Sequence, residues 1–87
     1  MKLTATIDPS HGWLRVPMHV LEQLNIVDKI TAYSYKCAGY AFLEEDFDWE
    51  TFVQAANKNG LQYSIKCKIL NKDSIIREYD RFTSENN

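Results

Sequence analysis

The sequence has little cysteine and no long apolar run, and each absence excludes a class of protein. It contains two cysteines, Cys37 and Cys67, and their spacing matches no zinc or redox motif. We expect both thiols to be reduced, with Cys67 in the core and Cys37 exposed at a turn. No stretch is long and apolar enough for a transmembrane helix, and no apolar segment follows Lys2 to form a signal peptide. These features predict a cytoplasmic protein without a membrane partner.

The sequence also lacks recognisable motifs for catalysis, metal binding or nucleotide binding. We find no nucleotide-binding loop, no metal-ligand spacing and no complete catalytic constellation. Asp8, Ser10 and His11 lie close together, but the members of a catalytic triad must converge from separate elements. We therefore interpret this segment as a polar turn. The sequence predicts a protein that is not an enzyme and that uses no cofactor or metal.

Length and charge limit the organisation and the partners of the chain. Its 87 residues predict one domain over residues 1–83 and a frayed tail over 84–87. A formal net charge of −2 argues against a general nucleic-acid binder. The charge is uneven, because acidic groups concentrate in residues 44–50 and basic groups in residues 51–82. Such a distribution favours either internal ion pairs or a contact surface of two signs.

Hydrophobic periodicity predicts an α+β fold. Alternation of apolar and polar side chains is typical of strands, and apolar residues three and four positions apart are typical of a helix. Strands are predicted at 2–7, 13–16, 30–35, 40–45, 61–69 and 75–82, and helices at 18–24 and 48–59. Asn25 and Gly60 end the helices, and Gly39 forms a hairpin turn. The prediction is an antiparallel sheet of about six strands (ββαββαββ) with two helices packed on it. The predicted core residues are Leu3, Ala5, Ile7, Leu21, Leu24, Ile30, Phe52, Val53, Ile65, Cys67 and Ile69.

An acidic cluster precedes the second helix. We interpret Asp48 as its N-cap, and Phe47 and Phe52 as a hydrophobic staple across its first turn. Two interpretations remain open for the other carboxylates, which either favour the helix dipole or form a contact surface for a partner. A divalent-cation site in a metal-dependent hydrolase is a further alternative, although consecutive residues of a strand point to opposite faces. The carboxylates concerned are Glu44, Glu45 and Asp46.

Tyrosines are more numerous in the central hairpin than one face of a small core can bury. About half of these aromatic rings, Trp13 included, are expected in the core, and the others on a protein contact surface. We predict a monomer or homodimer that binds another protein. The predicted contact residues are Tyr33, Tyr35, Tyr40, Glu44, Glu45 and Asp46. The alternative is a nucleic-acid-binding module in which tyrosines stack on bases and Lys66 and Lys68 follow the backbone.

Three segments resemble a pattern found in small uncharacterised proteins of phages and mobile elements. The segments are HGWLRVP at 11–17, YSY at 33–35 and YAFLEED at 40–46. In those proteins the third segment is YLEED, which Ala41 and Phe42 interrupt here. The resemblance covers roughly residues 8 to 60 and implies a context, not a catalytic residue. Compact phage proteins often bind a host or phage protein stoichiometrically, including inhibitors of host defence of the anti-CRISPR or anti-restriction type.

Overall fold

The computed structural model describes residues 1–83 and confirms an α+β fold. The strands are β1 (Lys2–Ile7), β2 (Gly12–Pro17), β3 (Tyr35–Cys37), β4 (Tyr40–Glu44), β5 (Ser64–Ile69) and β6 (Asp80–Arg81). The helices are α1 (Met18–Gln23) and α2 (Asp48–Lys58), with 3-10 turns η1 (Val27–Lys29) and η2 (Ile75–Glu78). No helix among the described residues is long and apolar enough to cross a membrane. The predicted tail at 84–87 lies outside the described residues.

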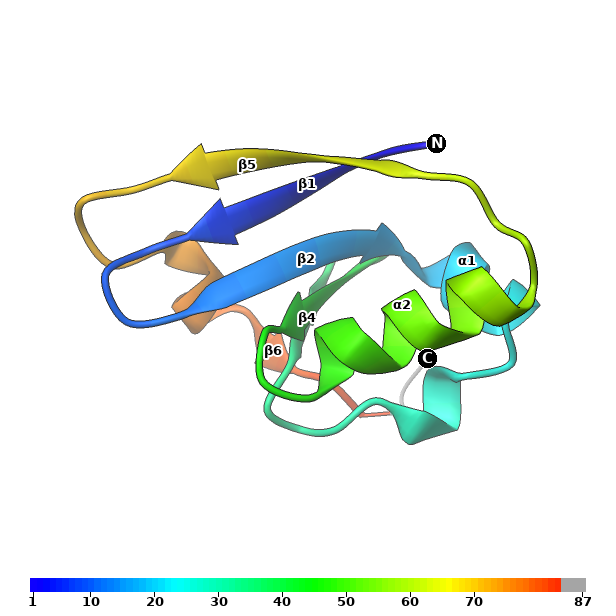
Figure 1. Ribbon diagram of the computed structural model, residues 1–87. Coiled ribbons are helices and arrows are strands. Elements are labelled where there is room, and N and C mark those ends of the chain that lie inside the picture. Colours follow the sequence, from blue (N-terminus) through cyan, green and yellow to red (C-terminus); the bar gives the residue numbers. More distant parts are fainter. Residues whose placement is uncertain (84–87) are drawn as a thin grey trace.

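One sheet contains all six strands, in the order β5-β1-β2-β4-β3-β6. Four neighbouring pairs are antiparallel, as predicted, but β5 runs parallel to β1. The sheet is therefore mixed, and the expectation of a wholly antiparallel sheet was wrong in this pairing. The physical reason is the route of the chain, since α2 carries it back along the sheet before β5 begins (Figure 1). Such a crossover is the connection that a parallel pair requires.

The main core lies between the sheet and its two helices. Leu14 and Val16 of β2 alternate with residues of the opposite face, and they pack in one cluster with Leu43 of β4. Phe52 and Ala56, four positions apart on α2, are fully buried in the same cluster. In Figure 1 α2, drawn in green, lies across one side of the sheet, and η2, drawn in orange, lies on the other side. The two faces of the sheet are therefore covered by different parts of the chain.

The predicted core extends too far toward β5. Cys67 and Ile69 are exposed, so their assignment to the core was wrong, whereas Cys37 is exposed as predicted. Cys67 and Ile69 do point to the same face of the sheet as the core residues of β1. They are exposed because β5 is an edge strand, at a side of the sheet that α2 does not cover. Four further predicted core residues are only partly buried, namely Ile7, Leu24, Val53 and Ile65. The remaining five predicted core residues are buried: Leu3, Ala5, Leu21, Ile30 and Phe52.

Two predicted strands are mostly irregular. The segment predicted as a strand at 30–35 holds a turn after η1, and β3 begins only at Tyr35. The segment at 75–82 forms η2 and then the short β6, which pairs with β3 and not with β5. In both places hydrogen bonds to distant carboxylates replace the ladder of a strand, as described below. Local alternation was therefore misleading at these two segments.

The predicted chain reversals are confirmed. Gly39 has a φ of 85° and Ala38 a φ of 53°, and this pair of positive values suits the tight turn between β3 and β4. At the end of α2 Gly60 has a φ of 68°, and the Leu61 N–H donates to the Ala56 carbonyl at 2.9 Å. That hydrogen bond is typical of a Schellman motif. Asn25, with a φ of 59°, ends α1 in the same way.

Candidate functional site

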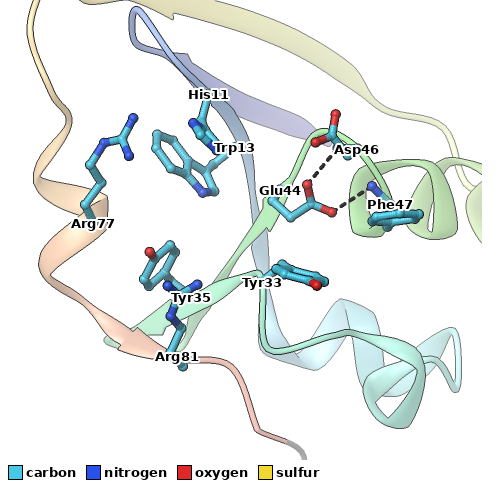
Figure 2. Close-up of a pocket in the computed structure, with 9 residues that line it drawn as sticks. All are labelled: His11, Trp13, Tyr33, Tyr35, Glu44, Asp46, Phe47, Arg77 and Arg81. Carbon is cyan, nitrogen blue, oxygen red and sulfur yellow. Dashed lines mark hydrogen bonds between the residues drawn. The ribbon is translucent and has the colours of Figure 1, made fainter.

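A pocket of about 420 Å³ opens on the side of the sheet opposite α2. We call it the aromatic pocket, since five of its nine lining residues carry an aromatic or imidazole ring. Figure 2 shows these side chains gathered around one hollow, supplied by the two ends of the chain and by its centre. The lining residues are His11, Trp13, Tyr33, Tyr35, Glu44, Asp46, Phe47, Arg77 and Arg81.

The floor of the aromatic pocket consists of two buried rings, each covered by an arginine. Trp13 of β2 and Tyr35 of β3 meet edge to face, with ring centroids 6.3 Å apart. The Arg77 guanidinium lies 5.3 Å from the Trp13 ring centroid, and that of Arg81 lies 4.6 Å from the Tyr35 centroid. Cations at such distances over ring faces are attracted by the ring quadrupole. The floor therefore presents the guanidinium groups of Arg77 and Arg81, which lie over the two buried rings.

The rim of the aromatic pocket carries two exposed rings. Tyr33 and Phe47 stack with centroids 6.3 Å apart, yet Tyr33 is 65% exposed and Phe47 62% exposed. Phe47 was predicted to form a staple with Phe52, and this was wrong. Phe52 lies in the core, whereas Phe47 precedes α2 and turns outward toward Tyr33 (Figure 2). Two large rings are thus held together in contact with water.

Arg77 is held in place by Asp8, which lies in the turn between β1 and β2. The Arg77 Nε and Nη2 donate to the two Asp8 carboxylate oxygens, each at 3.0 Å. The carboxylate of Asp8 also accepts the backbone N–H groups of Ser10, His11 and Ser74. The segment is a polar turn, as predicted, but its carboxylate also binds the C-terminal part of the chain. This forked ion pair places the Arg77 guanidinium beside Trp13.

The hydrogen bond from Arg77, with help from the backbone N–H groups, holds the pKa of Asp8 well below its usual range against the opposing effect of burial. The unfolded chain binds the proton near the ordinary value of about 3.9. A depressed folded pKa means that the stabilisation is complete above that value and is lost as the pH falls below it. We expect urea midpoints of the wild type to decrease as the pH drops below about 4, and those of Asp8→Asn to decrease less.

Asp73→Asn is the matched control for this pH dependence. Asp73 also approaches Arg77, at 4.0 Å, but its side chain is 78% exposed, and exposed pairs contribute little to stability. Its midpoints should follow those of the wild type at every pH. An Asp8→Asn profile that coincides with the wild type would contradict the assignment of the acid-sensitive group.

Glu44 is buried and acts on the backbone. Its carboxylate accepts the N–H groups of Asp46 at 2.8 Å, Phe47 at 2.7 Å and Asp48 at 3.2 Å. Figure 2 shows two of these bonds as dashed lines. These N–H groups lie at the start of α2 and have no partner within the helix. The Glu44 carboxylate therefore caps α2, which agrees with the helix-terminal interpretation of this residue.

Asp48 was predicted to be the N-cap of α2, and this was wrong. It is the first residue of the helix, and the helix has no cap hydrogen bond from the side chain at its N-cap position. The Asp48 carboxylate instead accepts the Thr31 N–H at 3.0 Å, the Thr31 hydroxyl at 2.8 Å and the Ser34 hydroxyl. The Ser34 Oγ in turn accepts the Glu44 N–H. Asp48 thus ties the turn before β3, and with it Tyr33, to the start of α2.

The structure brings together only some of the predicted contact residues. Tyr33, Tyr35, Glu44 and Asp46 all line the aromatic pocket, although Tyr35 and Glu44 are buried. Two other predicted contact residues, Glu45 and Tyr40, are not among the residues that line it. Tyr40 lies under Arg15, whose guanidinium is 4.7 Å from the ring centroid. The contact role of all six remains a prediction.

Lys66 and Lys68 lie away from these tyrosines. Their register partners on β1 are Thr4 and Thr6, which places both lysines on the sheet face opposite α2. Tyr35 is on the same face, but three strands separate β3 from β5, and with about 4.8 Å per strand the two are roughly 19 Å apart. The predicted nucleic-acid surface is therefore not one continuous patch. Among residues 1–83 no group of three or more His, Cys, Asp or Glu side chains is placed to hold a metal ion.

Five of the residues that line the aromatic pocket were not predicted as site residues: His11, Trp13, Phe47, Arg77 and Arg81. His11 stacks on Trp13 with centroids 5.9 Å apart and 15° between the ring planes. Both arginines lie in the last quarter of the chain, in a segment predicted to be a strand. The one sequence feature that pointed to the Asp8–Arg77 ion pair was the excess of basic residues after position 51, which favoured internal ion pairs as one interpretation.

No protein-family model, curated protein or solved structure matches the chain.

Proposed function

We propose that this chain is a protein-binding protein that acts stoichiometrically, and that its partner docks on the aromatic pocket. The observation that carries the proposal is the stacked pair of Tyr33 and Phe47, which is held in water beside a rigid floor. Exposed aromatic rings grouped with arginines in a concave site are the composition of binding hot spots. Apolar surface that a fold leaves exposed in one place often marks a contact site.

The rigidity of the pocket supports this proposal. Three carboxylates fix the residues of the pocket. Asp8 binds Arg77 of the floor, and Asp48 binds the turn at 31–34, which contains Tyr33. Glu44 binds the backbone N–H of Phe47. Side chains that are ordered before binding lose little conformational entropy when a partner arrives. The three carboxylates therefore serve the site by positioning its rings. Asp46 remains exposed at the pocket, where its charge can steer a basic region of the partner.

The resemblance to small proteins of phages and mobile elements supplies the biological context of the proposal. We propose that the chain acts in the cytoplasm of a host cell on a host or phage protein. Inhibition of a host defence system, of the anti-CRISPR or anti-restriction type, is the activity that such binding supports. Stoichiometric inhibition needs a stable contact surface and no catalytic group.

The test is the affinity for a partner captured from host lysate by the tagged protein and then purified. We expect calorimetry to give a defined stoichiometry with the wild type. The double variant Tyr33→Ala with Phe47→Ala should bind at least tenfold more weakly, which corresponds to about 1.4 kcal/mol. The reason is that both rings lose contact area that is used only in the complex.

Ile75→Ala is the matched control for the affinity measurement. Ile75 is 68% exposed, comparable to the two rings, but it does not line the aromatic pocket. The control should bind like the wild type, and all variants should unfold within about 0.5 kcal/mol of it. Equal affinity of the double variant and the wild type would place the partner elsewhere.

A further inference from the structure

The backbone N–H and C=O groups along the outer edge of β5 have no partner among residues 1–83. The Ser64 N–H donates to the Met1 carbonyl and the Leu70 N–H to the Ile7 carbonyl, so the even-numbered residues of this strand face β1. Because N–H groups alternate in direction along a strand, those of Ile65, Cys67 and Ile69 point away from the sheet. β5 is the first strand in the sheet order, and no described strand pairs with its outer side.

The two faces of this edge differ in chemistry. Ile65 and Cys67 share the face of Leu3 and Ala5, their register partners on β1, and Ile69 continues the row with 79% exposure. Lys66 and Lys68 are exposed on the opposite face. An apolar row and a basic row therefore border one line of free N–H and C=O groups.

We propose that β5 binds an extended segment of a partner protein in which apolar and acidic residues alternate. The segment would add a strand to the sheet, and its backbone would bond the outward N–H and C=O groups of Ile65, Cys67 and Ile69. Its apolar side chains would cover the row that α2 leaves open, and its carboxylates would face Lys66 and Lys68. This site lies at the β5 edge of the sheet, away from the aromatic pocket. It does not depend on the function proposed for that pocket.

Charge disfavours a second copy of this chain as the occupant. Two β5 strands paired edge to edge in antiparallel register would bring four lysine side chains onto one face. Like charges directly opposite each other on neighbouring strands are destabilising, and lysines on edge strands are a common protection against self-pairing. An acidic segment would not repel these lysines, and its carboxylates would form favourable cross-strand pairs with them.

The test uses a capped synthetic peptide of alternating valine and glutamate, about seven residues long to match β5. Titration into the ¹⁵N-labelled protein should shift amide signals of β5 and β1 in a saturable manner. A peptide of alternating valine and lysine should bind at least tenfold more weakly. With Lys66→Glu and Lys68→Glu together, the preference between the two peptides should reverse.

Two further probes test the backbone pairing. Cys67→Pro removes an outward N–H that β1 does not use, so it should abolish binding, whereas Cys67→Ala should not. If Cys67→Pro fails to fold, the wild type is titrated with the acidic peptide N-methylated at every residue, so that neither edge of the peptide can donate to β5, and this peptide should not bind. Binding that survives these changes would overturn the proposal.

Two other results would also overturn it. Concentration-dependent shifts without peptide would assign the edge to a second copy. Shifts with a single-stranded oligonucleotide but with neither peptide would assign the face to nucleic acid.

Discussion

Phe52→Ala is expected to lower the free energy of unfolding by about 3–5 kcal/mol. The Phe52 ring is fully buried between α2 and the sheet and meets Tyr63 edge to face, with centroids 5.3 Å apart. Truncation leaves a cavity that a close-packed core fills only in part. A domain of this length has roughly 4–13 kcal/mol of stability in total, so the loss is a large share of it. Urea denaturation followed by circular dichroism measures the loss directly.

Phe47→Ala is the control for Phe52→Ala, because it removes the same side chain from the start of the same helix. Phe47 is 62% exposed, so its removal should change the unfolding free energy by less than about 0.5 kcal/mol. Equal losses for the two variants would show that the helix face has been assigned wrongly. A loss near zero for Phe52→Ala would have the same meaning.

Glu44→Ala should cost about 2–3 kcal/mol, the second largest effect expected. Removal of the carboxylate leaves three backbone N–H groups at the start of α2 without their acceptor. Unsatisfied donors near a buried helix end are costly, and loss of a helix cap alone costs about 1 kcal/mol. The acidic cluster is therefore divided, because its first carboxylate belongs to the fold.

Glu45→Gln with Asp46→Asn is the matched control for Glu44→Ala. Both side chains are exposed, so the double variant should unfold within about 0.5 kcal/mol of the wild type. If the pair steers a basic partner, its neutralisation should slow association and weaken the salt dependence of the on-rate. A double variant that is as unstable as Glu44→Ala would mean that the whole cluster serves the fold.

The sequence predicted elements whose pattern depends on one long apolar face. β1, β2 and α2 were found because their alternation or helical spacing reflects burial against a common core. The reversals at Gly39 and Gly60 were found because only certain residues adopt a positive φ without strain. These features are local, so a single sequence is sufficient to predict them.

The segments predicted wrongly are those that distant side chains organise. The turn at 31–34 is bound by Asp48, 14 to 17 positions later in the chain, and η2 is tied to Asp8, 66 to 69 positions earlier. Apolar and polar residues alternate in these segments as they do in a strand. Hydrogen bonds to the carboxylates of Asp48 and Asp8 nevertheless fix the backbone in a turn and in a 3-10 helix. The aromatic pocket depends on the same contacts, which is why Arg77 and Arg81 were not predicted beside Trp13 and Tyr35.

Site-directed photocrosslinking tests the central claim, that a partner protein docks on the aromatic pocket. A photoreactive phenylalanine analogue replaces Phe47 in one variant and Ile75 in the other, since both positions are exposed but only Phe47 lines the pocket. We predict that irradiation in host lysate joins one defined protein to the Phe47 variant and not to the Ile75 variant. Crosslinking of the same protein from Ile75 alone, or of no protein from either position, would contradict the claim.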